Sequence, residues 1–149
     1  MKPVPFVGLS IMLLAGSNPA WSLSWRWSIA GAGVNVSGTF TTDDTPNAHG
    51  FYRITAVSGT ANGGTITALQ PAGTAIPGNA GYPVDNLVSM HGAQLTTHRF
   101  GFAVSDGEYH NPFRASGYLD YISTSPYADG AGKEPPIRFT ATVAPKPAP

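Results

Sequence analysis

The chain has 149 residues, a formal net charge of zero and no cysteine, and only 11% of its residues are charged, against roughly 25% in a typical soluble domain. This length accommodates one domain, and a hydrophobic fraction of 42% is enough for one packed core, which argues against global disorder. The absence of cysteine excludes disulfides, thiol catalysis and cysteine-type zinc sites, and the lack of any cluster of Lys or Arg argues against nucleic acid as a partner.

The N-terminal residues have the pattern of an export signal. Lys2 precedes an uncharged apolar run, VPFVGLSIMLLAG (4–16), and Ala20-Trp21-Ser22 places small residues at −3 and −1 for cleavage after Ser22. The run is shorter than the roughly 18 residues expected of a spanning helix. We therefore expect a signal peptide at 1–22, an all-β domain at 23–143 and a proline-rich tail at 144–149, with no membrane span after signal removal.

Beyond the signal, apolar residues follow the two-residue period of β-strands, and no stretch keeps a helical period for three turns. In SWRWSI (24–29), Trp25, Trp27 and Ile29 share one face. Arg26, Arg138 and the strand threonines lie opposite such apolar stripes and are predicted to meet solvent. Further strands are predicted in VNVSGTFT (34–41), NLVSMH (86–91), HRFGFAV (98–104), GYLDYI (117–122) and PIRFTATV (136–143).

The near-palindrome ITAVSGTANGGTITAL (54–69) predicts a β-hairpin, because Asn62-Gly63 supplies the positive φ angles of a tight turn. Two registers fit the sequence. A two-residue Asn62-Gly63 turn sets Val57 opposite Ala68, whereas a three-residue loop with a bulge sets Val57 opposite Leu69. The second is favoured here because it pairs the larger apolar groups.

Segments rich in Gly, Pro and Asn separate the strands and are predicted to be loops, at 41–50, 71–86, 105–117 and 123–136. Short alternating strands between such segments are typical of all-β proteins. The expected fold is a single antiparallel β-sandwich or flattened barrel of about eight strands.

Several segments, in order, resemble exported bacterial proteins of the PEP-CTERM class. They are WRWSIAGAGVNVSGTFTTDDTP, GFYRITAVSGTANGGTITALQPAGTAIPGN, VDNLVS and FGFAVSDGEYHNPF, and the likeness covers roughly residues 25 to 143. The resemblance implies a β-rich protein of the cell surface or polysaccharide matrix of a Gram-negative bacterium, with no catalytic residues to carry over. Members end with Val-Pro-Glu-Pro, an apolar helix and a basic tail. Here Val143-Ala144-Pro145-Lys146-Pro147 stands at that place and the sequence ends at Pro149, which is expected of a released protein or of a truncated sequence.

No sequence motif for catalysis or metal binding is found. Gly8-Leu9-Ser10 lies inside the predicted signal, and His49, His91, His98 and His110 lack the spacing of a zinc site. Asp106-Gly107-Glu108 and Asp85-Asn86 offer oxygen donors for calcium but do not match a calcium-binding loop. We therefore predict no cofactor and no metal.

The loops 71–86 and 105–117 hold the densest mixture of aromatic and hydrogen-bonding groups, and binding residues tend to lie on loops of a rigid scaffold. Any ligand site is predicted to use these loops, which requires that they lie at the same end of the fold. Tyrosines in or beside loops, Tyr82, Tyr109, Tyr118, Tyr121 and Tyr127, could form a platform for sugars. The candidate ligand residues are Tyr82, Asp85, Asn86, Asp106, Glu108, Tyr109, His110 and Asn111.

The functional expectation is a non-catalytic exported protein of the cell envelope or extracellular polysaccharide matrix, with polysaccharide as its partner. A carbohydrate-binding module is the alternative and a secreted hydrolase the third interpretation. The sequence does not specify an oligomeric state.

Overall fold

The computed structural model describes residues 21–31, 33–98, 100–115, 118–124 and 136–146. The apolar run at 4–16, most of the predicted loop at 123–136 and the last residues of the tail lie outside this part of the chain. The regular structure of the described residues consists of β-strands, as predicted. The strands are β1 (Ser22–Gly31), β2 (Val34–Asp43), β3 (Phe51–Ala61), β4 (Gly64–Leu69), β5 (Leu87–Ser89), β6 (Phe102–Val104), β7 (Tyr109–Ala115), β8 (Tyr118–Thr124) and β9 (Ile137–Val143).

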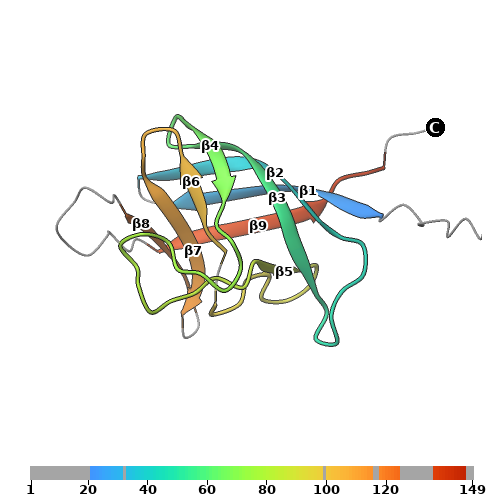
Figure 1. The fold of residues 1–149 in the computed structure, drawn as a ribbon. Helices are drawn as coiled ribbons and strands as arrows, with labels where there is room; N and C mark the ends of the chain where they lie inside the picture. The colour runs from blue at the N-terminus through green and yellow to red at the C-terminus, as the bar shows by residue number, and fades with distance from the viewer. Residues whose placement is uncertain (1–20, 32, 99, 116–117, 125–135, 147–149) are drawn as a thin grey trace, which may run out of the picture.

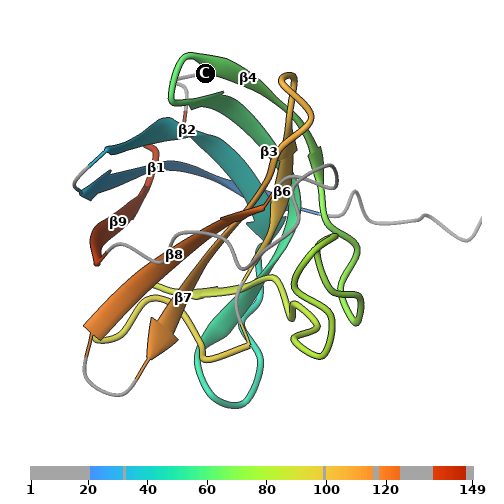
Figure 2. The same cartoon turned by 90° about the vertical axis from the view of Figure 1, so that its left-hand side faces the viewer.

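The strands form one curled antiparallel sheet, which confirms the flattened barrel of about eight strands. Its order is β8-β7-β6-β4-β3-β2-β1-β9, and the short β5 pairs with the beginning of β3. The sheet curls round a common interior, so that β8 and β9, the two ends of this order, come close to each other (Figures 1 and 2).

The inner face of the curled sheet holds a single core. Trp25, Trp27 and Ile29 alternate inward along β1 and are at most 3% exposed, as their spacing predicts. The Trp27 ring lies at the centre of an aromatic cluster, with its centroid 5.4 Å from that of Phe100 and 5.6 Å from that of Phe102, both edge-on. Such pairs contribute about 0.5–1.5 kcal/mol each beyond the burial of their area.

Two glycines face each other where β2 and β3 come very close. The tripeptide Ser-Gly-Thr occurs in β2 and again in β3, and the antiparallel register places Gly38 directly opposite Gly59. A Cβ built on Gly38 would lie 1.9 Å from the carbonyl oxygen of Ser58, and one on Gly59 would lie 2.2 Å from that of Ser37. Glycine in a strand interior marks such a close backbone approach. The two strands can therefore come this close only because neither position carries a side chain.

The β3–β4 hairpin is present, but the favoured register is wrong. Ala61 pairs with Gly64 and Thr60 with Thr65, so the turn contains two residues, Asn62 and Gly63. Their φ angles of 48° and 88° are both positive, as a type I′ turn requires. The preference for pairing Val57 with Leu69 fails because the turn holds two residues and the β3–β4 register ends at Thr60 and Thr65, whereas Leu69 pairs with Phe102 on the other side of β4.

The predicted loop at 105–117 is also partly wrong, because most of it is strand β7. Asn111 and Pro112 suggested a turn. The β6–β7 ladder covers only His110 and Tyr109, so Pro112 pairs only with Tyr121 of β8 and needs no bond to β6. Proline is compatible with a strand at such a position. The predicted strand at 98–104 is shorter than expected and comprises β6 alone, and the predicted loop at 41–50 begins inside β2.

One side chain, that of Gln94, forms hydrogen bonds to the free edge of β9 at Ala141. The Gln94 amide donates from Nε2 to the carbonyl of Ala141 at 2.7 Å, and Oε1 accepts from the Ala141 N–H at 2.9 Å. The same Nε2 also lies 3.2 Å from the carbonyl oxygen of Ser89. The side chain thus takes the place of a neighbouring strand and satisfies buried backbone groups that would otherwise be unpaired.

Candidate functional site

The segment 71–86 is irregular, as predicted, and packs against the sheet instead of standing free in solvent. Ile76 and Val84 are buried, and a Cβ on Gly101 would meet both of their side chains. The backbone is held at Gln70, whose N–H donates to the carbonyl of Gly101 at 2.8 Å. Tyr82 alone among the predicted ligand residues of this segment is largely exposed, at 55%.

Asp85 and Asn86 take part in structural hydrogen bonds. The Asp85 carboxylate accepts from the Thr96 hydroxyl at 2.7 Å and from the Leu87 N–H at 3.1 Å. Burial raises the pKa of the Asp85 carboxyl, and the bond from Thr96 opposes that rise. Asn86 has a φ of 54° and donates from Nδ2 to the carbonyl of Gln70 at 2.7 Å. Both side chains fix the end of the loop against the sheet.

Asp106 and Glu108 form the turn between β6 and β7. The Asp106 carboxylate accepts from the Glu108 N–H at 2.9 Å, and the carbonyl of Glu108 accepts from the Val104 N–H at 2.9 Å. Ser105 binds the neighbouring hairpin through Thr65, with its N–H on the Thr65 carbonyl at 2.8 Å. This turn therefore lies beside the β3–β4 turn.

Tyr109, His110 and Asn111 lie on β7, not in a loop, and the last two are buried. The His110 ring stacks on Phe102 with a centroid distance of 5.5 Å. Its Nε2 lies 3.2 Å from the Glu108 carboxylate. Burial lowers the pKa of His110, and the charges of Glu108 and Asp106 oppose that shift. Asn111 donates to the carbonyl of Phe100.

These residues do not assemble into one site. Leu69 at the end of β4 pairs with Phe102 at the beginning of β6, so the segment 71–86 starts at one end of the sheet. The β6–β7 turn follows the other end of β6, and Figure 1 shows it beside the β3–β4 turn, far from the segment 71–86. Asn79 of that segment reaches β7 through a 3.4 Å contact from its Nδ2 to Asn111 Oδ1. The structure therefore separates the β6–β7 turn from the segment 71–86 but brings Asn111, from the same predicted loop, into contact with that segment.

Of the five tyrosines in the predicted platform, the structure describes the side chains of Tyr82 and Tyr109. Tyr82 is exposed, whereas Tyr109 is partly buried on β7. Tyr118 and Tyr121 lie on β8, and their side chains are outside what the structure describes. Tyr127 is not among the described residues.

A different surface gathers polar groups in a regular array, the outer face of β9, β1, β2, β3 and β4. The strand registers place one row of hydroxyl residues across these five strands, namely Thr140, Ser28, Ser37, Thr60 and Thr65. The hydroxyl oxygens of Ser28 and Thr140 are 2.9 Å apart, and those of Thr39 and Ser58 in the adjacent row are also 2.9 Å apart. The alternation in the sequence predicted this exposure, but it did not show that the hydroxyls align across strands.

Arg26 and Arg138 stand on this face at the β1–β9 pair. Arg26 is opposite Thr142 and Arg138 opposite Ala30, so the arginines are four positions apart, about 14 Å along the strands. Two shallow hollows lie along the β1–β9 pair. One, of about 250 Å³, is lined by residues 26–28 and 140–142, and the other, of about 430 Å³, by residues 30–31 and 136–138. Over β1, β2 and β9 the outward positions between these arginines carry Ser, Thr, Asn and Ala, with no acidic residue among them.

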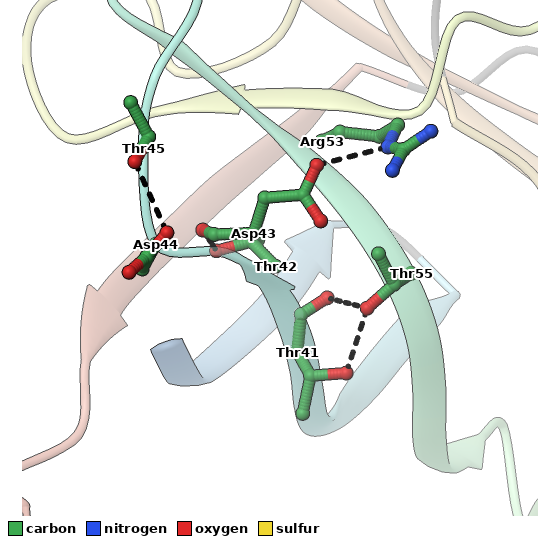
Figure 3. A network of polar contacts seen from close by, with 7 residues as sticks. All are labelled: Thr41, Thr42, Asp43, Asp44, Thr45, Arg53 and Thr55. Carbon is green, nitrogen blue, oxygen red and sulfur yellow. Dashed lines mark hydrogen bonds and ion pairs between the residues drawn. The ribbon is translucent and has the colours of Figure 1, made fainter. Parts of the chain in front are cut away.

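On the outer face, as far as the structure describes it, an acidic residue occurs at the C-terminal end of β2, away from Arg26 and Arg138. Figure 3 shows Asp43 paired with Arg53, with Nε and Oδ2 3.0 Å apart. In the same network, the Thr55 hydroxyl lies 3.1 Å from the hydroxyl oxygen of Thr41 and 3.2 Å from its carbonyl oxygen. The charge of Asp43 is thus balanced locally by Arg53, whereas no ion pair to Arg26 or Arg138 is found among the described residues.

Within the described ranges, no three His, Asp or Glu side chains are grouped as a metal ion would require. No helix in that part of the structure is long and apolar enough to cross a membrane. Comparisons with protein-family models, with curated proteins and with solved structures found no match to this chain.

Proposed function

We propose that this chain is a non-catalytic protein exported to the envelope or the extracellular polysaccharide matrix of a Gram-negative bacterium. The observation that carries the proposal is the outer face of the sheet, where exposed hydroxyls align across five strands around a compact aromatic core. Such a surface offers many hydrogen-bonding groups and little charge, which suits contact with the hydroxyls of a sugar polymer.

The hydrogen bonds of the candidate ligand residues support a structural role for their side chains. Asp85, Asn86 and Asn111 each use their side chains to hold backbone or neighbouring side chains in place. Asp106 stabilises the turn that contains it.

The position of β1 is compatible with export. Cleavage after Ser22 would remove only the first residue of β1, because the strand begins at Ser22 and its first buried residue is Trp25. The complete inner face of β1 would remain in the mature chain.

The test of export is N-terminal sequencing after expression of the full chain in a Gram-negative host. We expect protein recovered from the periplasm or medium to begin near Leu23. A soluble cytoplasmic product that keeps Met1 would contradict the proposal.

A carbohydrate-binding module is the second candidate, and the exposed ring of Tyr82 favours it. Aromatic rings held outward on a β-scaffold stack against the apolar faces of sugars. Under this alternative, retention in the matrix depends on Tyr82.

A further inference from the structure

We propose that the outer face of the β1–β9 pair is a binding surface for an acidic polysaccharide, with Arg26 and Arg138 contacting its carboxylates. The inference rests on the proposed function and specifies the chemical class of the polymer. It starts from the charge of the face, which carries these two arginines and no acidic residue between them.

The arginines are exposed and have no carboxylate partner among the described residues, in contrast to Arg53 with Asp43. A guanidinium group presents several donors in a planar fork that matches a carboxylate. The separation of about 14 Å exceeds the screening length of about 8 Å at physiological ionic strength, so the two cations hardly repel each other. Each is therefore available to a separate anionic group of one ligand.

The surface between the arginines suits a polymer better than a small anion. Ser28 and Thr140 lie midway, with their hydroxyls 2.9 Å apart, and Thr142 lies opposite Arg26. The hollows beside these residues are shallow and follow the strand direction. An extended chain that runs along β1 and β9 would meet a cation, a pair of hydroxyls and a second cation in turn.

One residue of the backbone edge next to this face, Ala141, is already hydrogen-bonded, which favours binding by side chains there. The Gln94 amide occupies the N–H and carbonyl of Ala141 on β9. A partner therefore cannot add as a further strand at that residue, and the arginines and hydroxyls of the outer face are the groups it can reach.

The experiment measures binding of the protein, produced from the full chain, to alginate as a polyuronate and to dextran as a neutral glucan. Arg26→Gln and Arg138→Gln should each weaken alginate binding about tenfold or more, the effect expected for loss of one charge-assisted contact. Arg53→Gln is the matched control, because it removes the same charge from a residue already paired with Asp43. It should change alginate binding less than about twofold. Thermal midpoints of all three variants should stay close to that of the wild type.

Equal losses in all three variants would overturn the inference, since net charge alone would then explain binding. Dextran binding as tight as alginate binding would also overturn it, as would binding to anionic lipid vesicles with the same dependence on Arg26 and Arg138. If alginate binding is unaffected by Arg26→Gln and Arg138→Gln while the exported protein stays in the matrix, the inference fails and the proposed function stands. A protein that is never exported would instead defeat the proposed function.

Discussion

The close approach of β2 and β3 at Gly38 and Gly59 predicts that Gly59→Ala is strongly destabilising. The added Cβ would lie 2.2 Å from the Ser37 carbonyl oxygen and 2.6 Å from the Gly38 Cα, and both contacts are with backbone that cannot rotate away. The φ of 141° adds strain for any L side chain. Strain of this kind costs about 1–3 kcal/mol, and forced separation of packed strands costs about as much again. We expect a total loss of about 2–6 kcal/mol.

The matched control is Gly63→Ala in the β3–β4 turn. Gly63 also has a positive φ, of 88°, but no atom lies within 4 Å of the position that the added methyl group would take. It should lose only about 1 kcal/mol through backbone strain. Urea unfolding followed by circular dichroism gives both free energies of unfolding, and Gly38→Ala provides a second variant at the same contact. If the free energies of unfolding of Gly59→Ala and Gly63→Ala differ by less than about 1 kcal/mol, β2 and β3 separate at little cost. The close approach at Gly38 and Gly59 would then not require glycine.

Three further predictions concern single side chains. Burial lowers the pKa of His110 below its ordinary 6.5, so the unfolded chain binds the proton more readily than the folded chain. The free energy of unfolding should therefore fall as the pH drops from about 6.5 through the folded pKa. His110→Phe keeps the stacking on Phe102 and should reduce this slope in urea midpoints measured from about pH 7.5 to 5. Gln94→Ala should lower the free energy of unfolding by about 2–4 kcal/mol, because it leaves the N–H and carbonyl of Ala141 unpaired. A loss below about 0.5 kcal/mol would show that water replaces the amide. Tyr82→Ala should leave the thermal midpoint within about 2 °C, because the ring is 55% exposed; matrix retention of the same variant distinguishes the carbohydrate-binding alternative, which requires that retention falls.

The alternation in the sequence predicted most of the strands with their buried faces, but it missed β7, which was expected to be a loop. Trp25, Trp27 and Ile29 point inward as their spacing indicates, and Asn62-Gly63 forms the turn that its conformational preference favours. The register of that hairpin could not be predicted from side-chain size. Leu69 pairs with Phe102, which is 33 positions further along the chain. A rule that considers only the two strands of the hairpin cannot predict such a pairing.

The candidate site was less predictable, because it depends on which ends of the strands meet. The β6–β7 turn and the segment 71–86 have similar compositions, but the antiparallel pairing of β6 with β4 places them at different ends of the sheet. His110 is buried against Phe102, and Asn111 binds the carbonyl of Phe100; Pro112 concealed the strand that places them there. The array on the outer face arises only when separate strands come into register.

The central claim, that the protein is exported and held by extracellular polysaccharide, is tested most directly by fractionation of cells that express the full chain. The amount of processed protein in the washed matrix fraction is compared between a polysaccharide-producing strain and an otherwise identical strain that cannot make the polymer. We predict that the protein begins near Leu23 in both strains, that it remains with the matrix in the first and that it appears in the medium in the second. Equal retention in the two strains, or full-length protein in the cytoplasm, would contradict the claim.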